Sequence, residues 1–335
     1  MNLDSIARIS LSQFPTPLDE APRLAKELGL DKLFIKRDDC TNLGLGGNKV
    51  RKLEYLMADA LAKQADVVIT LGGIQSNHAR LTAAAARKVG IPECILVLSG
   101  AWDGRWLGNM LLDIVFGATV RVLPDAGVKQ TEAEADRIVS QLQQEGHRPY
   151  LIPMGGSNPI GALGYVSAIR ELASQMGKDA DPLIIIAVGS GGTIAGCVLG
   201  VKLFMPNAEV LGISVAGMSG FFKKHSAEVA TGTARLLDED MTFTADDIDV
   251  NDQYFGAKYA VPSEAGNAAI LLAGRTEGLI LDPVYTGKAM SGLIDLAKTG
   301  QIDPNRPVVF LHTGGSPALM AYEEEFRGQA LDFRL

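Results

Sequence analysis

Between residues 183 and 193 the chain reads Leu183-Ile184-Ile185-Ile186-Ala187-Val188-Gly189-Ser190-Gly191-Gly192-Thr193. The first six residues are all apolar, which is typical of a strand buried on both faces of a parallel sheet. The glycines then allow a tight turn, and the residues that follow have the pattern of a helix. A buried strand that passes through a glycine turn into a helix indicates an α/β fold.

The rest of the chain repeats this alternation of short apolar runs and helix-periodic stretches, which predicts open, twisted and mostly parallel sheets. Predicted strands cover Leu33–Lys36, Val67–Thr70, Ile95–Leu98, Thr119–Val122, Tyr150–Ile152, Leu183–Val188, Val210–Ser214 and Val308–Leu311. Helices are expected between most of them, including Glu132–Gln144 and Ser263–Thr276. Residues 218–260 carry charges and few periodic runs, so we expect this region to pass over the surface.

Two glycine-rich segments, residues 44–47 and 154–161, are candidate joints between domains. If both are hinges, the part of the chain between them forms a smaller domain inserted in a larger one. We therefore predict a large domain of residues 1–51 and 161–335 and a small domain of residues 52–160. Ligands of open α/β sheets bind beyond the carboxyl ends of the strands, so we expect the active site in the cleft between the domains.

Composition excludes several other classes of protein. The net charge of −8 argues against a nucleic-acid partner, which needs a basic face. The three cysteines are scattered, so we expect neither a disulfide framework nor a metal site. The first five residues lack the pattern of a signal peptide, and the apolar runs are too short to cross a membrane. The expected protein is a soluble cytoplasmic enzyme.

Lys49 is the first candidate for catalysis. It lies in the segment Leu45-Gly46-Gly47-Asn48-Lys49-Val50-Arg51-Lys52-Leu53-Glu54, where two glycines precede a helix-periodic run. Cationic neighbours (Arg51 and Lys52) and partial burial both favour the neutral amine of a lysine. A neutral amine can attack an aldehyde and form a Schiff base. The alternative is a solvated lysine at the start of a helix.

The glycine turn after Val188 is a candidate phosphate site, because backbone amides at a helix start bind anions. An ordinary tight turn would have the same sequence. A dinucleotide-binding loop needs glycine three residues after Gly191, where this chain has Ile194. The pattern therefore favours a smaller molecule that carries a phosphate.

Polar groups follow three further predicted strands or turns. Ser76, Asn77 and His78 open an alanine-rich helix, where they could cap it or hold a carboxylate. Tyr285 begins another helix and is either a core aromatic residue or an acid–base group. Thr313 ends the last predicted strand at another glycine turn.

Taken together, these segments resemble the pyridoxal-phosphate enzymes of the tryptophan-synthase-β fold type, also called fold type II. Within that group the chain is most similar to D-cysteine desulfhydrases and 1-aminocyclopropane-1-carboxylate deaminases. The resemblance runs from Phe14-Pro15-Thr16-Pro17-Leu18 through Ile35-Lys36-Arg37-Asp38-Asp39 to Ala318-Leu319-Met320-Ala321-Tyr322. It covers nearly the whole chain, with the motifs in the expected order.

The resemblance implies that pyridoxal 5'-phosphate is linked to Lys49. Asn77 would then bond the cofactor's 3-hydroxyl and Thr313 would face its pyridine nitrogen. Its phosphate would be held by Gly189, Ser190, Gly191, Gly192 and Thr193. Catalytic roles are implied for Lys49, Ser76, Tyr259 and Tyr285, and substrate contacts for Ser76, Asn77, His78, Tyr285 and Thr286. We expect a small amino acid as substrate and a homodimer as the assembly.

Thr286 and Thr313 form a desulfhydrase-like pair, which favours D-cysteine elimination to pyruvate, ammonia and hydrogen sulfide. The next alternative is an L-cysteate sulfo-lyase, in which Arg105 could bind the sulfonate instead of forming a surface ion pair with Asp103. A cyclopropane deaminase is a further alternative. A nicotinamide oxidoreductase or a small-molecule binding protein on the same fold would lack the lysine chemistry.

Overall fold

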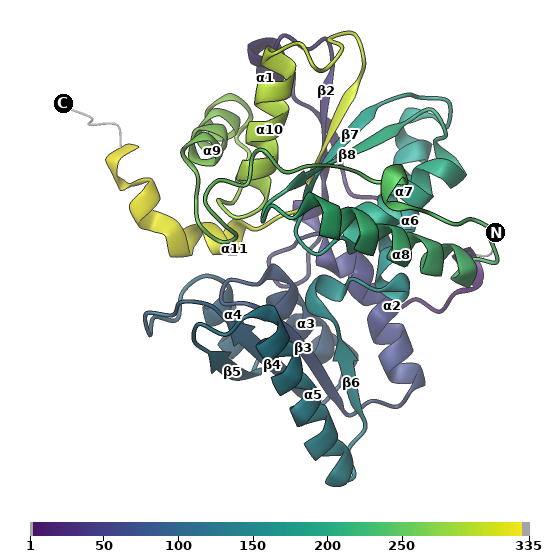
Figure 1. Cartoon of the computed structure of the whole chain (residues 1–335), viewed down its shortest axis with the longest axis vertical. Helices are drawn as coiled ribbons and strands as arrows, with labels where there is room; N and C mark the ends of the chain where they lie inside the picture. Colours follow the sequence, from purple (N-terminus) through teal and green to yellow (C-terminus); the bar gives the residue numbers. More distant parts are fainter. Residues whose placement is uncertain (1–2, 330–335) are drawn as a thin grey trace.

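The computed structural model describes residues 3–329, which form two sheets with helices packed around them (Figure 1). Residues 1–2 and 330–335, which belong to the predicted large domain, lie outside the described part of the chain. The six-stranded sheet has the order β1 (Leu18–Glu20), β2 (Leu33–Arg37), β10 (Val308–His312), β7 (Leu183–Val188), β8 (Glu209–Ser214) and β9 (Asp249–Asn251). Its neighbouring strands are parallel except for β1, which is antiparallel to β2.

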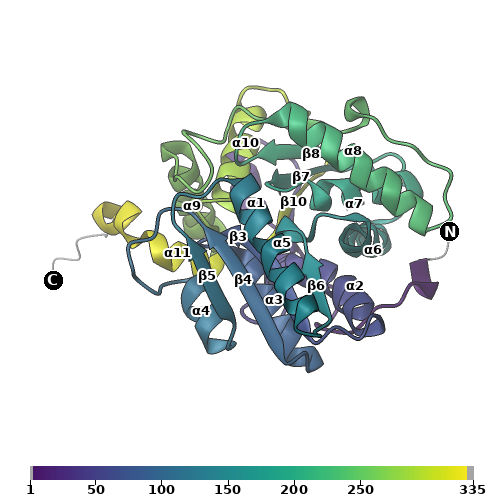
Figure 2. The same ribbon diagram turned by 60° about the horizontal axis from the view of Figure 1, so that its bottom comes forward.

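The four-stranded sheet is parallel and has the order β5 (Thr119–Leu123), β4 (Glu93–Ser99), β3 (Val67–Gly73) and β6 (Pro149–Ile152). Its strands come from one continuous stretch of chain between β2 and β7. The strands of the larger sheet come from both sides of that stretch, and the two sheets occupy different parts of the molecule (Figures 1 and 2). This arrangement confirms the predicted α/β class with two sheets.

Helices cover both faces of each sheet. They are α1 (Pro22–Leu28), α2 (Lys49–Ala62), α3 (Asn77–Val89), α4 (Asn109–Val115), α5 (Val128–Gln144), α6 (Pro159–Met176), α7 (Gly192–Phe204), α8 (Ser219–Leu236), α9 (Glu264–Glu277), α10 (Thr286–Lys298) and α11 (Ser316–Leu319). One core of the large sheet contains α6, α7 and α8, and the other contains α1, α9 and α10. The small sheet likewise packs α2 and α3 on one face and α5 on the other. Burial on both faces explains why β7 is apolar throughout.

The predicted strands are confirmed, with small differences at their ends. Strands β1 and β9 were missed because each has only three residues and contains acidic side chains. The expectation for residues 218–260 was wrong, since an 18-residue helix, α8, occupies the first half of this region. Its buried face includes Phe222 and Ala230, but its first residue follows Met218, which makes no side-chain cap and has a left-handed φ of 56°. The usual signal for a helix start was therefore absent.

Within residues 3–329, no helix has both the length and the apolar character needed to cross a membrane.

Candidate active site

Lys49 is the first residue of α2, as the sequence predicted. The four residues before Asn48 all have a positive φ, from 52° at Gly44 to 129° at Gly47. The Lys49 side chain is partly buried, and desolvation lowers the pKa of its amine from 10.5 to about 8. A much larger fraction of this amine is therefore neutral near pH 8 than for an ordinary lysine, which is the form needed for attack on an aldehyde.

The glycine loop after β7 forms a tight turn at the start of α7. Gly191 has a φ of 85°, and a Cβ atom there would lie 2.7 Å from the Ser226 hydroxyl oxygen. A Cβ atom on Gly192 would lie 2.7 Å from the Cα of Ser157. Side chains are thus excluded from a turn at a helix N-terminus, where backbone amides and the helix dipole favour an anion.

Lys52 and Ser157 complete this turn. The Lys52 ammonium is fully buried and donates to the Gly155 carbonyl at 3.1 Å. A Cβ atom on Gly192 would lie 3.0 Å from this ammonium, so the cation is next to the glycine loop. The Ser157 hydroxyl accepts the amide of Gly192 at 3.1 Å and donates to the Ser190 hydroxyl at 2.7 Å. The segment predicted as a hinge, residues 154–161, therefore lines the candidate phosphate site.

The charge of Lys52 indicates what this site can bind. Burial, and then the nearby Lys49, hold the pKa of Lys52 well below its usual value. Among residues 3–329, no carboxylate forms an ion pair with it. Burial without a carboxylate partner favours the neutral amine of Lys52, and an anion such as a phosphate bound beside the glycine turn would favour its charged form, so the site fits an anionic ligand.

Asn48 connects Lys49 to two other predicted site segments. Its amide side chain donates to the Thr193 hydroxyl at 3.2 Å, and its backbone amide donates to the Thr313 carbonyl at 3.0 Å. Thr193 and Thr313 are both buried, with exposed fractions of 6% and 8%. These bonds hold the start of α2 against the glycine loop and against the end of β10.

The start of α3 brings together three more predicted residues. Ser76 caps the helix, because its hydroxyl accepts the amide of Ala79 at 3.1 Å. The Asn77 side-chain carbonyl accepts from the amide of Asn109 at 2.9 Å. The His78 Nε2 atom lies 3.0 Å from the Thr70 hydroxyl.

His78 is a neutral residue in this environment. Burial, and then the charges of Lys49 and Lys52, hold the pKa of its imidazole well below 6.5. Its Nδ1 atom is buried and has no hydrogen-bond partner in the described part of the chain. The structure therefore places His78 near both lysines, with one ring nitrogen still able to accept or donate a hydrogen bond.

Tyr259 and Tyr285 lie between the large sheet and the small sheet. Their hydroxyl oxygens are 2.5 Å apart and their rings meet edge to face. A Cβ atom on Gly189 would lie 2.9 Å from the Tyr285 ring, and one on Gly73 would lie 3.4 Å from the Tyr259 ring. The pair therefore touches both the glycine loop of the large sheet and the carboxyl end of β3 in the small sheet. Burial raises the pKa of both hydroxyls, so both are protonated.

Two predicted residues are engaged elsewhere. The Thr286 hydroxyl is fully buried and donates to the Asp282 carboxylate at 2.8 Å, while it accepts the Asp282 amide at 2.7 Å. Asp282 also accepts the amide of Tyr285 at 2.9 Å, so this turn fixes the tyrosine. Arg105 is exposed, and its guanidinium donates to Asp103 at 2.6 Å. This surface ion pair is the alternative that the sequence allowed for Arg105.

In the sequence, Lys52 stands out only as a cationic neighbour of Lys49, and Asn48 and Ser157 do not stand out as site residues. A spacing of three residues places Lys49 and Lys52 on one side of a helix, which was the available signal for Lys52. The role of Ser157 could not be inferred in this way, because its contact with Ser190 spans 33 residues and depends on the fold.

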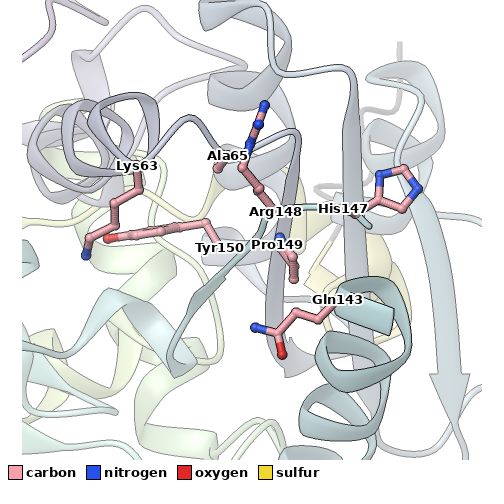
Figure 3. Close-up of a pocket in the computed structure, with 7 residues that line it drawn as sticks. All are labelled: Lys63, Ala65, Gln143, His147, Arg148, Pro149 and Tyr150. Carbon is pink, nitrogen blue, oxygen red and sulfur yellow. The ribbon is translucent and has the colours of Figure 1, made fainter. Parts of the chain in front are cut away.

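A surface pocket of about 270 Å³ lies away from these residues (Figure 3). It is lined by Lys63, Ala65, Gln143, His147, Arg148, Pro149 and Tyr150, near the amino ends of β3 and β6. Its basic side chains already have partners: Lys63 pairs with Asp59 at 2.7 Å, the His147 ring lies 3.4 Å from Asp66, and the Arg148 guanidinium donates to the Gln64 carbonyl at 2.6 Å. The pocket is at the wrong end of the strands for a substrate site of an open α/β fold.

Several known proteins are similar to this chain over nearly its whole length. The chain is 43% identical over 327 residues to a D-cysteine desulfhydrase of Klebsiella pneumoniae (strain 342), an alignment that covers 96% of this chain and 98% of the relative. A D-cysteine desulfhydrase of Salmonella choleraesuis (strain SC-B67) is 41% identical over the same shares. The crystal structure of an ACC deaminase homologue superposes with a TM-score of 0.89 at 39% identity, covering 98% of each chain.

The predicted fold and cofactor class follow from these findings. The structural neighbours are enzymes of fold type II, which confirms the fold type that the sequence motifs implied. Residues 9–314 match the family described as "Pyridoxal-phosphate dependent enzyme". This match spans more than half of the chain, and the chain therefore belongs to the family of pyridoxal-phosphate-dependent enzymes.

Proposed function

We propose that this chain catalyses β-elimination of D-cysteine, which with one water molecule yields pyruvate, ammonia and hydrogen sulfide. The observation that carries this proposal is that Lys49 and the buried Lys52 both lie beside the glycine loop, to which Asn48 also bonds. The substrate is inferred from relatives named D-cysteine desulfhydrase that match over 96% of the chain. The pair Thr286 and Thr313, typical of desulfhydrases, supports the same substrate.

The residues around the glycine loop fit pyridoxal phosphate. Its phosphate would be held by the amides of residues 189–193, the Thr193 hydroxyl and the Lys52 ammonium. Asn77 would bond its 3-hydroxyl, and Thr313 would face its pyridine nitrogen. When bound, the cofactor supplies an electron sink for the negative charge that develops at the substrate Cα.

The protein's own residues would then bind and orient the amino acid. The start of α3 offers a capped helix N-terminus for the substrate carboxylate, with Ser76, Asn77 and His78 beside it. A neutral His78 would add a hydrogen bond to this carboxylate without adding a positive charge to the site. Lys49, with its lowered pKa, would attach the cofactor and also act as the base that takes the Cα proton.

Tyr259 and Tyr285 would border the substrate on the side away from α3. Both hydroxyls are protonated, so either could donate a proton to the hydrosulfide that leaves Cβ, which is then released as hydrogen sulfide. We propose that Thr286 affects the substrate through the Asp282 turn that fixes Tyr285.

The direct test compares wild type with Lys49→Ala and with the control Lys63→Ala. Lys63 is an exposed lysine at the opposite end of α2. Wild type and Lys63→Ala should release pyruvate and sulfide from D-cysteine. Both should also show an absorbance band near the edge of the visible range that borohydride bleaches. Lys49→Ala should lose the band and at least about a thousandfold of turnover, since one residue serves as both attachment point and base.

A substrate panel identifies the reaction among the alternatives. D-cysteine, L-cysteine, L-cysteate and 1-aminocyclopropane-1-carboxylate would be supplied to the wild-type enzyme. Preferred release of sulfite from L-cysteate would mean a sulfo-lyase, and preferred ring opening of the cyclopropane acid would mean a deaminase. Retained D-cysteine turnover in Lys49→Ala would reject the role given to Lys49.

We also propose that the protein is a cytoplasmic homodimer. Each chain would have a large domain of residues 1–51 and 161–335 and a small domain of residues 52–160. The continuous stretch that supplies the small sheet supports this division, although the first boundary falls within α2 and the second within α6. Helix α4 exposes Leu111, Ile114 and Val115, an apolar face that a second copy could cover. Sedimentation that finds only monomers, or cell fractionation that finds the protein elsewhere, would contradict this assembly or location.

A further inference from the structure

Arg80 lies on α3, the helix that begins with Ser76 and Asn77, but its side chain reaches the loop that leads to Lys49. The residue is fully buried. Its guanidinium donates to the Gly46 carbonyl at 2.8 Å and also to the Gly44 carbonyl. One side chain thus binds two carbonyls that lie three and five residues before Lys49.

This loop needs fixing because its backbone is unusual. Residues 44–47 all have a positive φ, and one of them is Leu45, which is not glycine. A Cβ atom on Gly46 would lie 2.1 Å from the Asp39 carbonyl oxygen, so the backbone passes very close to its neighbours. A run of left-handed residues persists only where the surroundings hold it in place.

The loop is held from two directions. Thr41 accepts the amide of Gly47 at 2.8 Å and donates to its carbonyl at 3.0 Å. Arg80 holds it from α3, which packs in the core of the small sheet. Because Asn77 and Arg80 are three residues apart on one helix, they lie on the same side of it. Arg80 therefore connects the proposed carboxylate-binding end of α3 directly to the backbone that carries Lys49.

Arg80 has a single nearby counter-charge within residues 3–329. Burial lowers the pKa of Arg80 to about 10, and the charge of Asp113 opposes this shift. Both Asp113 carboxylate oxygens are buried, and neither has a hydrogen-bond partner in that part of the chain. Burial also raises the pKa of Asp113 to about 8. The hydrogen bonds of the Arg80 guanidinium go to the loop before Lys49 and not to this carboxyl group.

We propose that Arg80 is a positioning residue that sets the Lys49 amine relative to the substrate and cofactor sites. This inference rests on the proposed function, in which Lys49 is the point of covalent attachment. The two carbonyl bonds would keep the start of α2 at a fixed distance from the start of α3. Loss of these bonds would let Lys49 move while the glycine loop and Lys52 stay in place.

The test separates attachment at Lys49 from binding at the phosphate site. Pyridoxal 5'-phosphate can use both, whereas pyridoxine 5'-phosphate lacks the aldehyde and can use only the second. Dissociation constants of both compounds would be measured for apoenzyme of wild type, Arg80→Met and Arg80→Lys. Arg80→Met should raise the dissociation constant of pyridoxal phosphate by roughly tenfold or more, with little change in the dissociation constant of pyridoxine phosphate.

Arg87→Met is a matched control on the same helix. Arg87 also donates to backbone carbonyls, those of Phe116 at 2.8 Å and Pro92 at 2.6 Å, but these lie in other loops. Its replacement should leave the ratio of the two dissociation constants at the wild-type value. Arg80→Lys keeps the charge but cannot hold both carbonyls as a guanidinium does. The ratio of the two dissociation constants in Arg80→Lys should therefore lie between the values for wild type and Arg80→Met.

Each outcome gives a decision. Equal weakening of both compounds in the Arg80 variants would mean general damage to the fold and would overturn the inference, as would an unchanged ratio. If Arg80→Met does not fold, the ratio in Arg80→Lys decides. If wild-type enzyme itself does not prefer pyridoxal phosphate to pyridoxine phosphate, the proposed function fails, which is a result distinct from failure of the Arg80 inference.

Discussion

Lys49 and Lys52 lie one turn apart on α2, and the fold gives them different environments. Desolvation lowers the pKa of Lys49 to about 8, while Lys52 is fully buried beside the glycine loop. Lys49 could be predicted because its signals are local: two glycines, a helix start and cationic neighbours. For Lys52 the only local signal was its spacing of three residues from Lys49, because its contact with the Gly155 carbonyl spans 103 residues.

The lowered pKa of Lys49 predicts when its amine reacts. Amines react in the neutral form, so labelling of Lys49 in apoenzyme by trinitrobenzenesulfonate should rise with pH through a midpoint near 8 rather than 10.5. Peptide mapping would follow the Lys49 peptide at each pH, and Lys49→Ala would confirm its assignment. A midpoint above about 10 would show that desolvation does not act on this amine.

At the scale of elements, the buried strands and the turns that follow them were the most predictable parts of the structure. Continuous apolar runs such as Leu183–Val188 mark strands that are covered on both faces. Helix α8 was missed because its start lacks a capping side chain, and β9 because it has only three residues. The placement of the tyrosine pair between the two sheets could not be predicted, since it depends on contacts between distant elements.

The junction of β7 and α7 gives an element-scale prediction. Gly191→Ala should weaken pyridoxal phosphate binding by about tenfold or more, because a Cβ atom would lie 2.7 Å from the Ser226 hydroxyl and the φ of 85° disfavours alanine. The control is Gly220→Ala in α8, where a Cβ atom would meet nothing within 4 Å. Equilibrium dialysis would measure both, and equal affinities for the two variants would place the phosphate away from this turn.

At the scale of the whole molecule, a buried ionic network joins parts of the chain that are far apart in sequence. Asp38 follows β2 and is fully buried, and its carboxylate accepts from Arg51 of α2 at 2.8 Å and from Tyr165 of α6 at 2.6 Å. Burial alone would raise the pKa of Asp38, but Arg51, together with Tyr165 and Lys36, outweighs this and holds the pKa below its usual value. The network therefore fixes the helix that begins at Lys49 against the large sheet.

Removing one member should destabilise the whole fold, because it leaves the other charges buried without a partner. Asp38→Asn should lower the free energy of unfolding by about 3–5 kcal/mol, read from the midpoint of denaturant unfolding. Asp103→Asn removes a carboxylate from the exposed ion pair with Arg105 and should leave that midpoint nearly unchanged. If the two variants unfolded at the same denaturant concentration, the Asp38 network would not be what holds α2 in place. A lower midpoint for Asp38→Asn alone would mean that this network, which joins β2, α2 and α6, contributes to the stability of the whole fold.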